Sequence, residues 1–142
     1  MINRILCAVD LTHSDDSRKL LAEADRLADV YDASLSVVTV LPDYNSSWVG
    51  TFFKDGTLKE AASAANDALH ALVKEALPRR AKVQHIVEIG VVYEQVLKAI
   101  SQSKADLVII GAHKPAMADK LLGPNSARIA RLSPVSTLIF RG

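Results

Sequence analysis

The sequence VIIGAHKPAMADKLLGPNS, residues 108–126, joins the end of an apolar strand to a polar loop and the start of a helix. The strand, predicted over 107–110, stops at Gly111, where the missing side chain permits an unusual backbone angle and the close approach of a ligand. Gly123 stands at the N-cap of the helix and Pro124 at its first position, where the absent proline N–H costs nothing. The stretch therefore predicts one strand-loop-helix unit.

The predicted helix start is also a candidate anion site. The N–H groups of Asn125 and Ser126 lack partners inside the helix, and the helix dipole makes this end positive. The chain from 114 to 131 carries four basic side chains and one acidic one: Lys114, Lys120, Arg128, Arg131 and Asp119. These local features fit both a phosphate-binding loop and an ordinary solvated basic loop.

The rest of the chain repeats the same alternation of strand and helix. Strands are predicted over 5–9, 35–41, 82–89, 107–110 and 135–140, and helices over 14–31, 58–76, 92–103 and 124–132. Ser14 is the predicted N-cap of the first helix, and Pro42 is predicted to end the second strand. The order predicts one α/β domain over 1–142, a five-stranded parallel open sheet of order 3-2-1-4-5 with helices on both faces.

In such a sheet, ligands bind outside the carboxyl ends of the strands, where the strand order reverses. Asp10, Val40, Gly90 and Gly111 fall at these ends. Asp10 either faces a ligand or caps the turn that follows it. His13 is interpreted as a solvated loop residue, because no second metal-type ligand is spaced with it.

The segment 42–57 fits neither a strand nor a helix and holds four of the seven aromatic residues of the chain. These are Tyr44, Trp48, Phe52 and Phe53. A disordered linker would be poor in aromatic residues. The segment is interpreted as a lid or an interface, and packing onto its own domain is the alternative.

The composition excludes several classes of protein. A net charge of +1 argues against a dedicated nucleic-acid binder, which usually carries a strong basic excess. The apolar runs are shorter than the roughly 20 residues that a membrane span needs, so no membrane insertion is predicted. One cysteine and a strand that starts at once after the N-terminus fit a cytoplasmic protein without a signal peptide.

Common nucleotide-binding motifs do not follow the first strand. The chain has no G-x-G-x-x-G there and no G-x-x-x-x-G-K-[ST], so a usual dinucleotide site and a P-loop are excluded. Asp15 and Asp16 would repel a phosphate held at Thr12 and Ser14, as a flavodoxin-type loop requires. The paired acids and the lysine of a phospho-acceptor domain are also missing. A phosphate loop after the fourth strand remains.

Along its whole length the chain resembles the universal stress protein family. The resemblance rests on ILCAVD at 5–10, TVL at 39–41, GAHK at 111–114, LLGPNS at 121–126 and SPVSTLI at 133–139. ATP-binding members carry G-x-x-G, nine residues and then G-[ST]. Here Gly111 and Gly123 match the first and third glycines, Lys114 replaces the second, and Pro124 replaces the hydroxyl residue. A subgroup with His-[Lys/Arg]-Pro and Leu-Leu-Gly-x-Asn, whose members also bind ATP, is more similar.

The resemblance implies an ATP site, with or without Mg²⁺, built from Ala8, Val9, Asp10, Val40, Gly111, His113, Lys114, Gly123, Asn125 and Ser126. Asp10 would contact the adenine or ribose side, and the backbone of Val40 would meet the base. Gly111 would let the ribose and phosphates approach. The amides of Asn125 and Ser126 would hold the phosphates, and Lys114 could pair with them.

The resemblance also implies a cytoplasmic, nucleotide-dependent regulator of the stress response that acts through an unknown protein partner. No catalytic triad, acid pair or metal cluster is legible in the sequence, and the metal ligands of an ATP complex are not expected from side chains. The alternatives are a slow adenine-nucleotide hydrolase and a partner-binding module without nucleotide. The last strand, short and apolar near the chain end, suggests association, and the resemblance implies a homodimer through it with contacts around Val135, Thr137 and Ile139.

Overall fold

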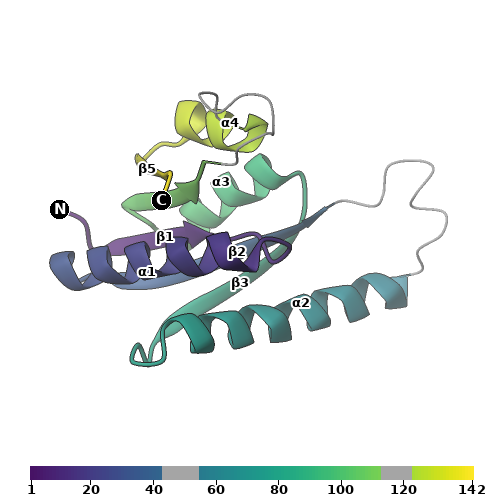
Figure 1. The fold of residues 1–142 in the computed structure, drawn as a ribbon. Coiled ribbons are helices and arrows are strands. Elements are labelled where there is room, and N and C mark those ends of the chain that lie inside the picture. Colours follow the sequence, from purple (N-terminus) through teal and green to yellow (C-terminus); the bar gives the residue numbers. More distant parts are fainter. Residues whose placement is uncertain (43–54, 113–122) are drawn as a thin grey trace.

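The computed structural model describes residues 1–42, 55–112 and 123–142. These residues form the strands β1 (Arg4–Ala8), β2 (Ser34–Pro42), β3 (Val83–Gly90), β4 (Leu107–Gly111) and β5 (Ser136–Phe140). The helices between them are α1 (Ser14–Tyr31), α2 (Asp55–Ala76), α3 (Val92–Ser103) and α4 (Pro124–Leu132). All strand pairs are parallel, and the order β3-β2-β1-β4-β5 confirms the predicted fold (Figure 1).

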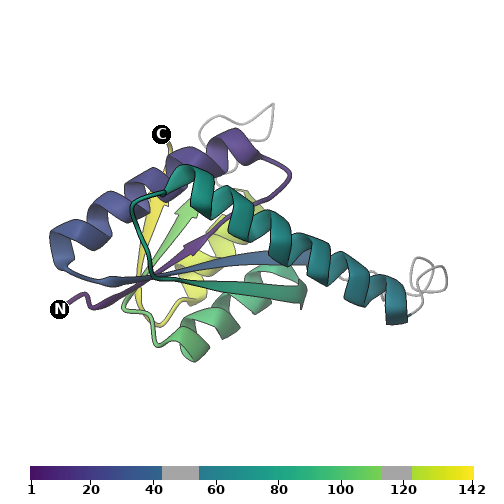
Figure 2. The ribbon, with the colours of Figure 1, turned by 90° about the horizontal axis from the view of Figure 1, so that it is seen from below.

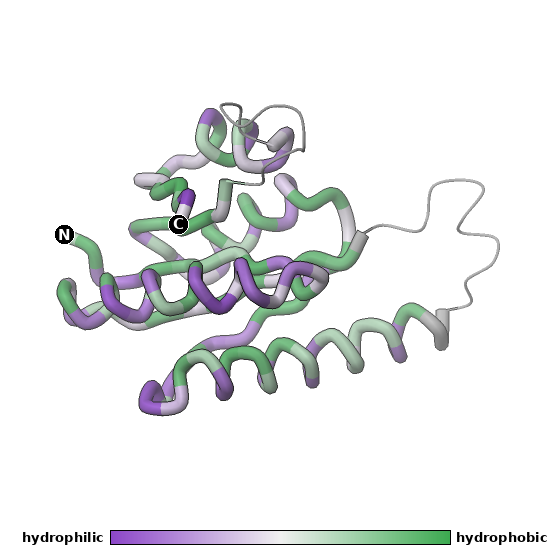
Figure 3. Tube along the Cα trace, in the orientation of Figure 1, coloured by the Kyte–Doolittle hydropathy of each residue, from purple (hydrophilic) through white to green (hydrophobic). Residues whose placement is uncertain are grey.

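The sheet separates two apolar cores. Figure 2 shows α1 and α2 on one face, with α3 and α4 on the other. Because successive side chains of a strand point to opposite faces, Ile5 and Cys7 of β1 enter the core under α1 and α2, while Leu6 enters the core under α3. Residues 5–8 of β1 and 107–110 of β4 are therefore apolar, whereas the helices alternate between polar and apolar residues (Figure 3).

Several predicted boundaries are wrong by one to three residues. Helix α1 has His13 as its N-cap and Ser14 as its first residue, and α2 begins at Asp55 instead of 58. Strand β2 includes Pro42, which lies beside Gly90 of β3. β1 ends opposite residue 38, so at position 42 the strand β2 has a neighbour on one side only, β3. A proline, which has no backbone N–H, is tolerated at such a position. The aromatic residues predicted for a lid, from Tyr44 to Phe53, lie outside the described residues.

Polar contacts between distant residues secure the amino-terminal end of the sheet. The carboxylate of Asp106, just before β4, accepts hydrogen bonds from the backbone N–H groups of Asn3 and Arg4 at 2.8 and 2.9 Å. Arg80, in the turn before β3, donates to the carboxylates of Asp25 and Asp29 on α1.

Among the described residues, no helix has the length and apolar character needed to cross a membrane.

Candidate functional site

The carboxyl ends of β1, β2 and β4 meet at one rim of the sheet. Ala8 at the end of β1 lies between Val38 of β2 and Ile110 of β4. The N–H of the following residue, Val9, donates to the carbonyl of Val38 at 2.9 Å. The chain crosses to β2 on one side of β1, and β4 lies on the other side, so the strand order reverses here. This is the position where open α/β sheets bind ligands.

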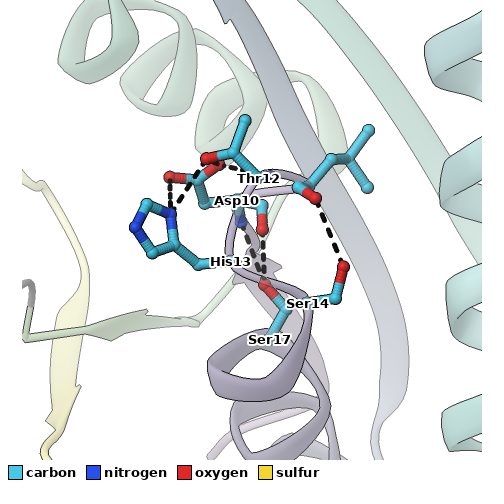
Figure 4. Close-up of polar contacts among 6 residues, drawn as sticks. Asp10, Thr12, His13, Ser14 and Ser17 are labelled. Carbon is cyan, nitrogen blue, oxygen red and sulfur yellow. Dashed lines mark hydrogen bonds and ion pairs between the residues drawn. The ribbon is translucent and has the colours of Figure 1, made fainter.

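Asp10 lies at this rim and is held by its own turn (Figure 4). One carboxylate oxygen accepts the backbone N–H of Thr12 at 2.9 Å and the Thr12 hydroxyl at 2.6 Å. The ring of His13 lies with Nδ1 3.1 Å from the other oxygen and 2.9 Å from Thr12 Oγ1. The Thr12 hydroxyl already donates its hydrogen to Asp10, so its oxygen can only accept from the His13 ring. The Asp10 carboxylate also accepts, so Nδ1 of His13 is the ring nitrogen that carries a hydrogen.

These contacts bear on two predictions. His13 lies in the turn before α1 and is exposed, as predicted, and its ring also contacts the Asp10 carboxylate. Of the two roles predicted for Asp10, facing a ligand or capping the turn, the structure shows the cap. Its side chain nevertheless remains 58% exposed, so capping does not close it to a ligand.

The environment keeps Asp10 charged. Partial burial raises its pKa, but the hydrogen bonds from Thr12 and the charge and hydrogen bond of His13 outweigh burial and lower the pKa below its usual range. The group is therefore a carboxylate at neutral pH. It suits hydroxyl or amine donors of a ligand and would repel a phosphate.

Ser17 fixes the backbone of Asp10 and was not singled out from the sequence. Its hydroxyl donates to the Asp10 carbonyl at 2.8 Å and accepts the Asp10 N–H at 3.2 Å. The residue is only 3% exposed. It occupies the buried stripe of α1 that continues through Leu21, Ala24 and Ala28, and a polar residue on such a stripe is the signal that could have revealed it.

The start of α4 is attached directly to the end of β4. The Ser126 hydroxyl, in a residue only 7% exposed, donates to the carbonyl of Gly111 at 2.8 Å. Gly123 is the N-cap and Pro124 the first helical residue, as predicted, and the N–H of Ala127 makes the first helical bond, to Gly123. The amides of Asn125 and Ser126 precede that bond and lie at the positive end of the helix.

Gly111 does not have the unusual backbone angle that the sequence predicted. Among the described glycines, a positive φ occurs at Gly90, with a value of 147°. Gly111 instead continues β4 beside Phe140, so extended backbone suffices there. Among the described residues, the nearest neighbour of a methyl group added at Gly111 would be the Leu20 side chain, 4.0 Å away. The described part of the chain therefore leaves room above this glycine.

The basic side chains of α4 are directed differently from the sequence-based expectation. Arg128 stacks on the ring of Tyr93 in α3, with its guanidinium carbon 4.8 Å from the ring centroid. Arg131 lies in the last turn, at the opposite end of the helix from Gly123. His113 and Lys114 lie outside the described residues.

Most of the predicted site residues share the rim. Those that the structure describes are Ala8, Val9, Asp10, Val40, Gly111, Gly123, Asn125 and Ser126. They come from the ends of β1, β2 and β4 and from the first turn of α4. The positive end of α4 and the Asp10 carboxylate therefore border the same rim of the sheet.

Strand β5, predicted to mediate dimerisation, is one of the two outer strands of the sheet. Val135 and Ile139 pack against the core under α3 but stay partly exposed. The hydroxyl oxygen of Thr137 is buried and has no hydrogen-bond partner within the described residues. The edge that the dimer prediction needs is present.

Comparison with known proteins identifies the family. The profile of the Universal stress protein family matches residues 1–141. Universal stress protein G of Shigella flexneri is 26% identical over 143 residues, covering 99% of this chain and 100% of that protein. Two solved structures share the fold. A universal stress protein in complex with cAMP is 21% identical, with a TM-score of 0.71 over 99% of this chain and 97% of that one.

The second structure is the universal stress protein from Archaeoglobus fulgidus in complex with dAMP, at 18% identity and a TM-score of 0.66 over 99% of this chain and 100% of that one. At these identities the two structures establish the fold alone. The family profile extends over nearly the whole chain and agrees with the observed strand order. This protein therefore belongs to the universal stress protein family.

Proposed function

We propose that this chain is a nucleotide-dependent regulator that binds ATP, with Mg²⁺ carried on the phosphates, at the rim formed by β1, β2, β4 and α4. The observation that carries the proposal is the bond from Ser126 to the Gly111 carbonyl. It holds the positive start of α4 against the open space above Gly111, across the rim from the Asp10 carboxylate. One end of the site thus suits phosphate and the other suits hydroxyl or amine donors.

The family members of known structure support an adenine nucleotide. One is in complex with cAMP and another with dAMP. These two ligands share adenine and differ in the sugar and in the attachment of the phosphate. They therefore support the adenine end of the proposed site more strongly than the triphosphate end.

Each residue receives a role on this proposal. Asp10 accepts hydrogen bonds from the ribose, and the backbone at Ala8, Val9 and Val40 lines the base. The amides of Asn125 and Ser126 bind phosphate oxygens, to which His113 and Lys114 would add positive or hydrogen-bonding groups. The Ser126 hydroxyl already donates to Gly111, so we assign no metal contact to it.

Calorimetric titration of nucleotide-free protein with Mg-ATP, ADP, AMP and cAMP tests the proposal. We expect micromolar binding of ATP, weakened about tenfold by Asp10→Asn, because a hydrogen bond to a charged acceptor is lost. Asp67→Asn, which changes an exposed aspartate on α2, is the matched control and should bind like the wild type. Absence of binding by all four nucleotides would reject the site and favour a module that binds only a protein partner.

The position of β5 as an outer strand of the sheet supports a homodimer formed through this strand, because an antiparallel copy of β5 could pair with its outer edge. Sedimentation analysis at micromolar concentration should give the mass of two chains. A monomer under these conditions would contradict the dimer without affecting the nucleotide site.

A further inference from the structure

β3 is an outer strand of the sheet, at the opposite margin from β5. Within the described residues β3 pairs with β2 alone, and Figure 2 shows it at the margin of the sheet, with α2 on one face. An unpaired edge offers a row of N–H and C=O groups to which an extended peptide can add as a further strand. The first half of β3 lies at the amino-terminal end of the sheet, away from the proposed nucleotide site at the carboxyl end. Binding at this edge is therefore independent of the proposed function.

A hollow lies on each side of the first half of β3. The one between α2 and β3 has a volume of about 300 Å³ and is lined by His70, Lys74, Leu77, Arg80, Val83 and His85. The other has a volume of about 410 Å³ and is lined by Ser34, Ser36, Ala81, Lys82 and Gln84. The side chains of an added strand would alternate between the two faces and could enter the two hollows in turn.

The unpaired charge of these hollows belongs to two lysines. Every titratable side chain in either lining is basic, but Arg80 is ion-paired with Asp25 and Asp29 of α1, which offset its charge. Lys74 and Lys82 form no ion pair with any described residue. These two lysines therefore favour a negatively charged partner.

The two histidines favour an anion over a metal ion. The rings of His70 and His85 are stacked, with centroids 3.6 Å apart and planes inclined by 17°. Lone pairs of imidazole lie in the ring plane, so two stacked rings do not converge on one metal ion. A carboxylate beside the pair would instead stabilise a protonated ring.

We propose that the outer edge of β3 binds an extended acidic segment of another protein as an added strand. Its acidic side chains would reach the basic hollows on the two faces, and its backbone would pair with β3.

A fluorescein-labelled peptide of about ten residues, with glutamate alternating with valine and threonine, tests the proposal by anisotropy. A peptide with lysine in place of glutamate is the control for charge. We expect saturable binding of the acidic peptide, weaker at high salt, and at least tenfold weaker binding of the lysine peptide. Equal binding of both peptides, or binding of neither, would overturn the proposal.

Charge reversal and hydrogen exchange locate the site. The double change Lys74→Glu with Lys82→Glu should weaken the acidic peptide about tenfold and strengthen the lysine peptide. Lys59→Glu, on the same helix but outside both hollows, is the matched control, and unchanged thermal unfolding confirms folding. The bound peptide should slow amide exchange in β3. Slowed exchange in β5 instead would place the peptide on the other edge and overturn the assignment.

Discussion

The two ends of the sheet are held together in different ways. At the amino-terminal end, Asp106 and Arg80 connect residues that lie 51 to 103 positions apart in the chain. At the carboxyl end, the contacts of Asp10 reach only two to seven residues along the chain, and its side chain stays largely exposed. Long-range contacts secure the scaffold, while local contacts orient a side chain and leave its outer face available to a ligand.

Two glycines at the carboxyl end give the sharpest test of this difference. An added Cβ at Gly90 would lie 2.8 Å from the Gln95 side chain at a φ of 147°, so Gly90→Ala should lower the free energy of unfolding by about 3 kcal/mol. Gly111→Ala should change it by less than about 0.5 kcal/mol but weaken nucleotide binding, because the methyl group enters open space.

Urea unfolding and calorimetric titration of both variants provide the measurements. Equal losses of stability would show that Gly111 is a structural glycine like Gly90. Unchanged nucleotide affinity in Gly111→Ala would place the ligand elsewhere.

Removing the long-range contacts of Arg80 should affect the scaffold alone. Arg80→Ala leaves Asp25 and Asp29 without their shared cation, and the arginine is mostly buried. We expect the free energy of unfolding to fall by about 2 kcal/mol in urea titrations, with nucleotide affinity unchanged. Arg131→Ala, an exposed arginine in the last turn of α4, is the control. A loss of nucleotide affinity in Arg80→Ala would mean that the two ends are coupled.

Ser17 should affect both stability and binding, because its buried hydroxyl holds the backbone of Asp10. Ser17→Ala leaves the Asp10 N–H and carbonyl without this partner and should cost about 1 kcal/mol in unfolding free energy. Nucleotide affinity should fall a few-fold, because the carboxylate loses its fixed position. Ser14→Ala, which removes only a 3.3 Å contact to the Leu11 carbonyl, is the control. Unchanged affinity in Ser17→Ala would show that Asp10 needs no such support.

The smallest expected effect is a pH dependence from the stacked histidines. Burial and the charge of His70 lower the pKa of His85, while a hydrogen bond to the backbone of Val83 acts in the opposite direction. Unfolded His85 therefore binds protons more readily than folded His85, so the free energy of unfolding should fall as the pH drops below the unfolded pKa of about 6.5.

Urea titrations at pH 7.5 and pH 5.5 measure this difference, which should be below about 1 kcal/mol and smaller in His70→Gln than in the wild type. The carboxyl groups of Asp10 and Asp106 titrate below this window, because their contacts lower their pKa values from 3.8. An identical pH dependence in His70→Gln would exclude the stacked pair as its source.

Much of the scaffold was predictable because its signals are local. Apolar runs at β1 and β4, the alternation in β3 and the Gly123-Pro124 pair each act within one turn or one strand. Parallel strands joined by helical crossovers allow few arrangements, and the predicted strand order agrees with the observed one. The boundary at Pro42 was missed because the free-energy cost of a proline in a strand depends on how many neighbouring strands pair with it. Only β3 pairs with β2 at this position, which the sequence does not show.

The site was predictable only as a set of positions. The sequence by itself determined that Asp10, Gly111 and the start of α4 would share one rim, because parallel strands end on the same side. Tertiary structure alone decided that Ser17 holds Asp10, that Ser126 bonds to Gly111 and that Arg128 turns to Tyr93. Hydrophobic periodicity reports which face of an element is buried. Hydrogen bonds and ion pairs between elements depend on distances of a few ångströms, which exist only after the elements have packed.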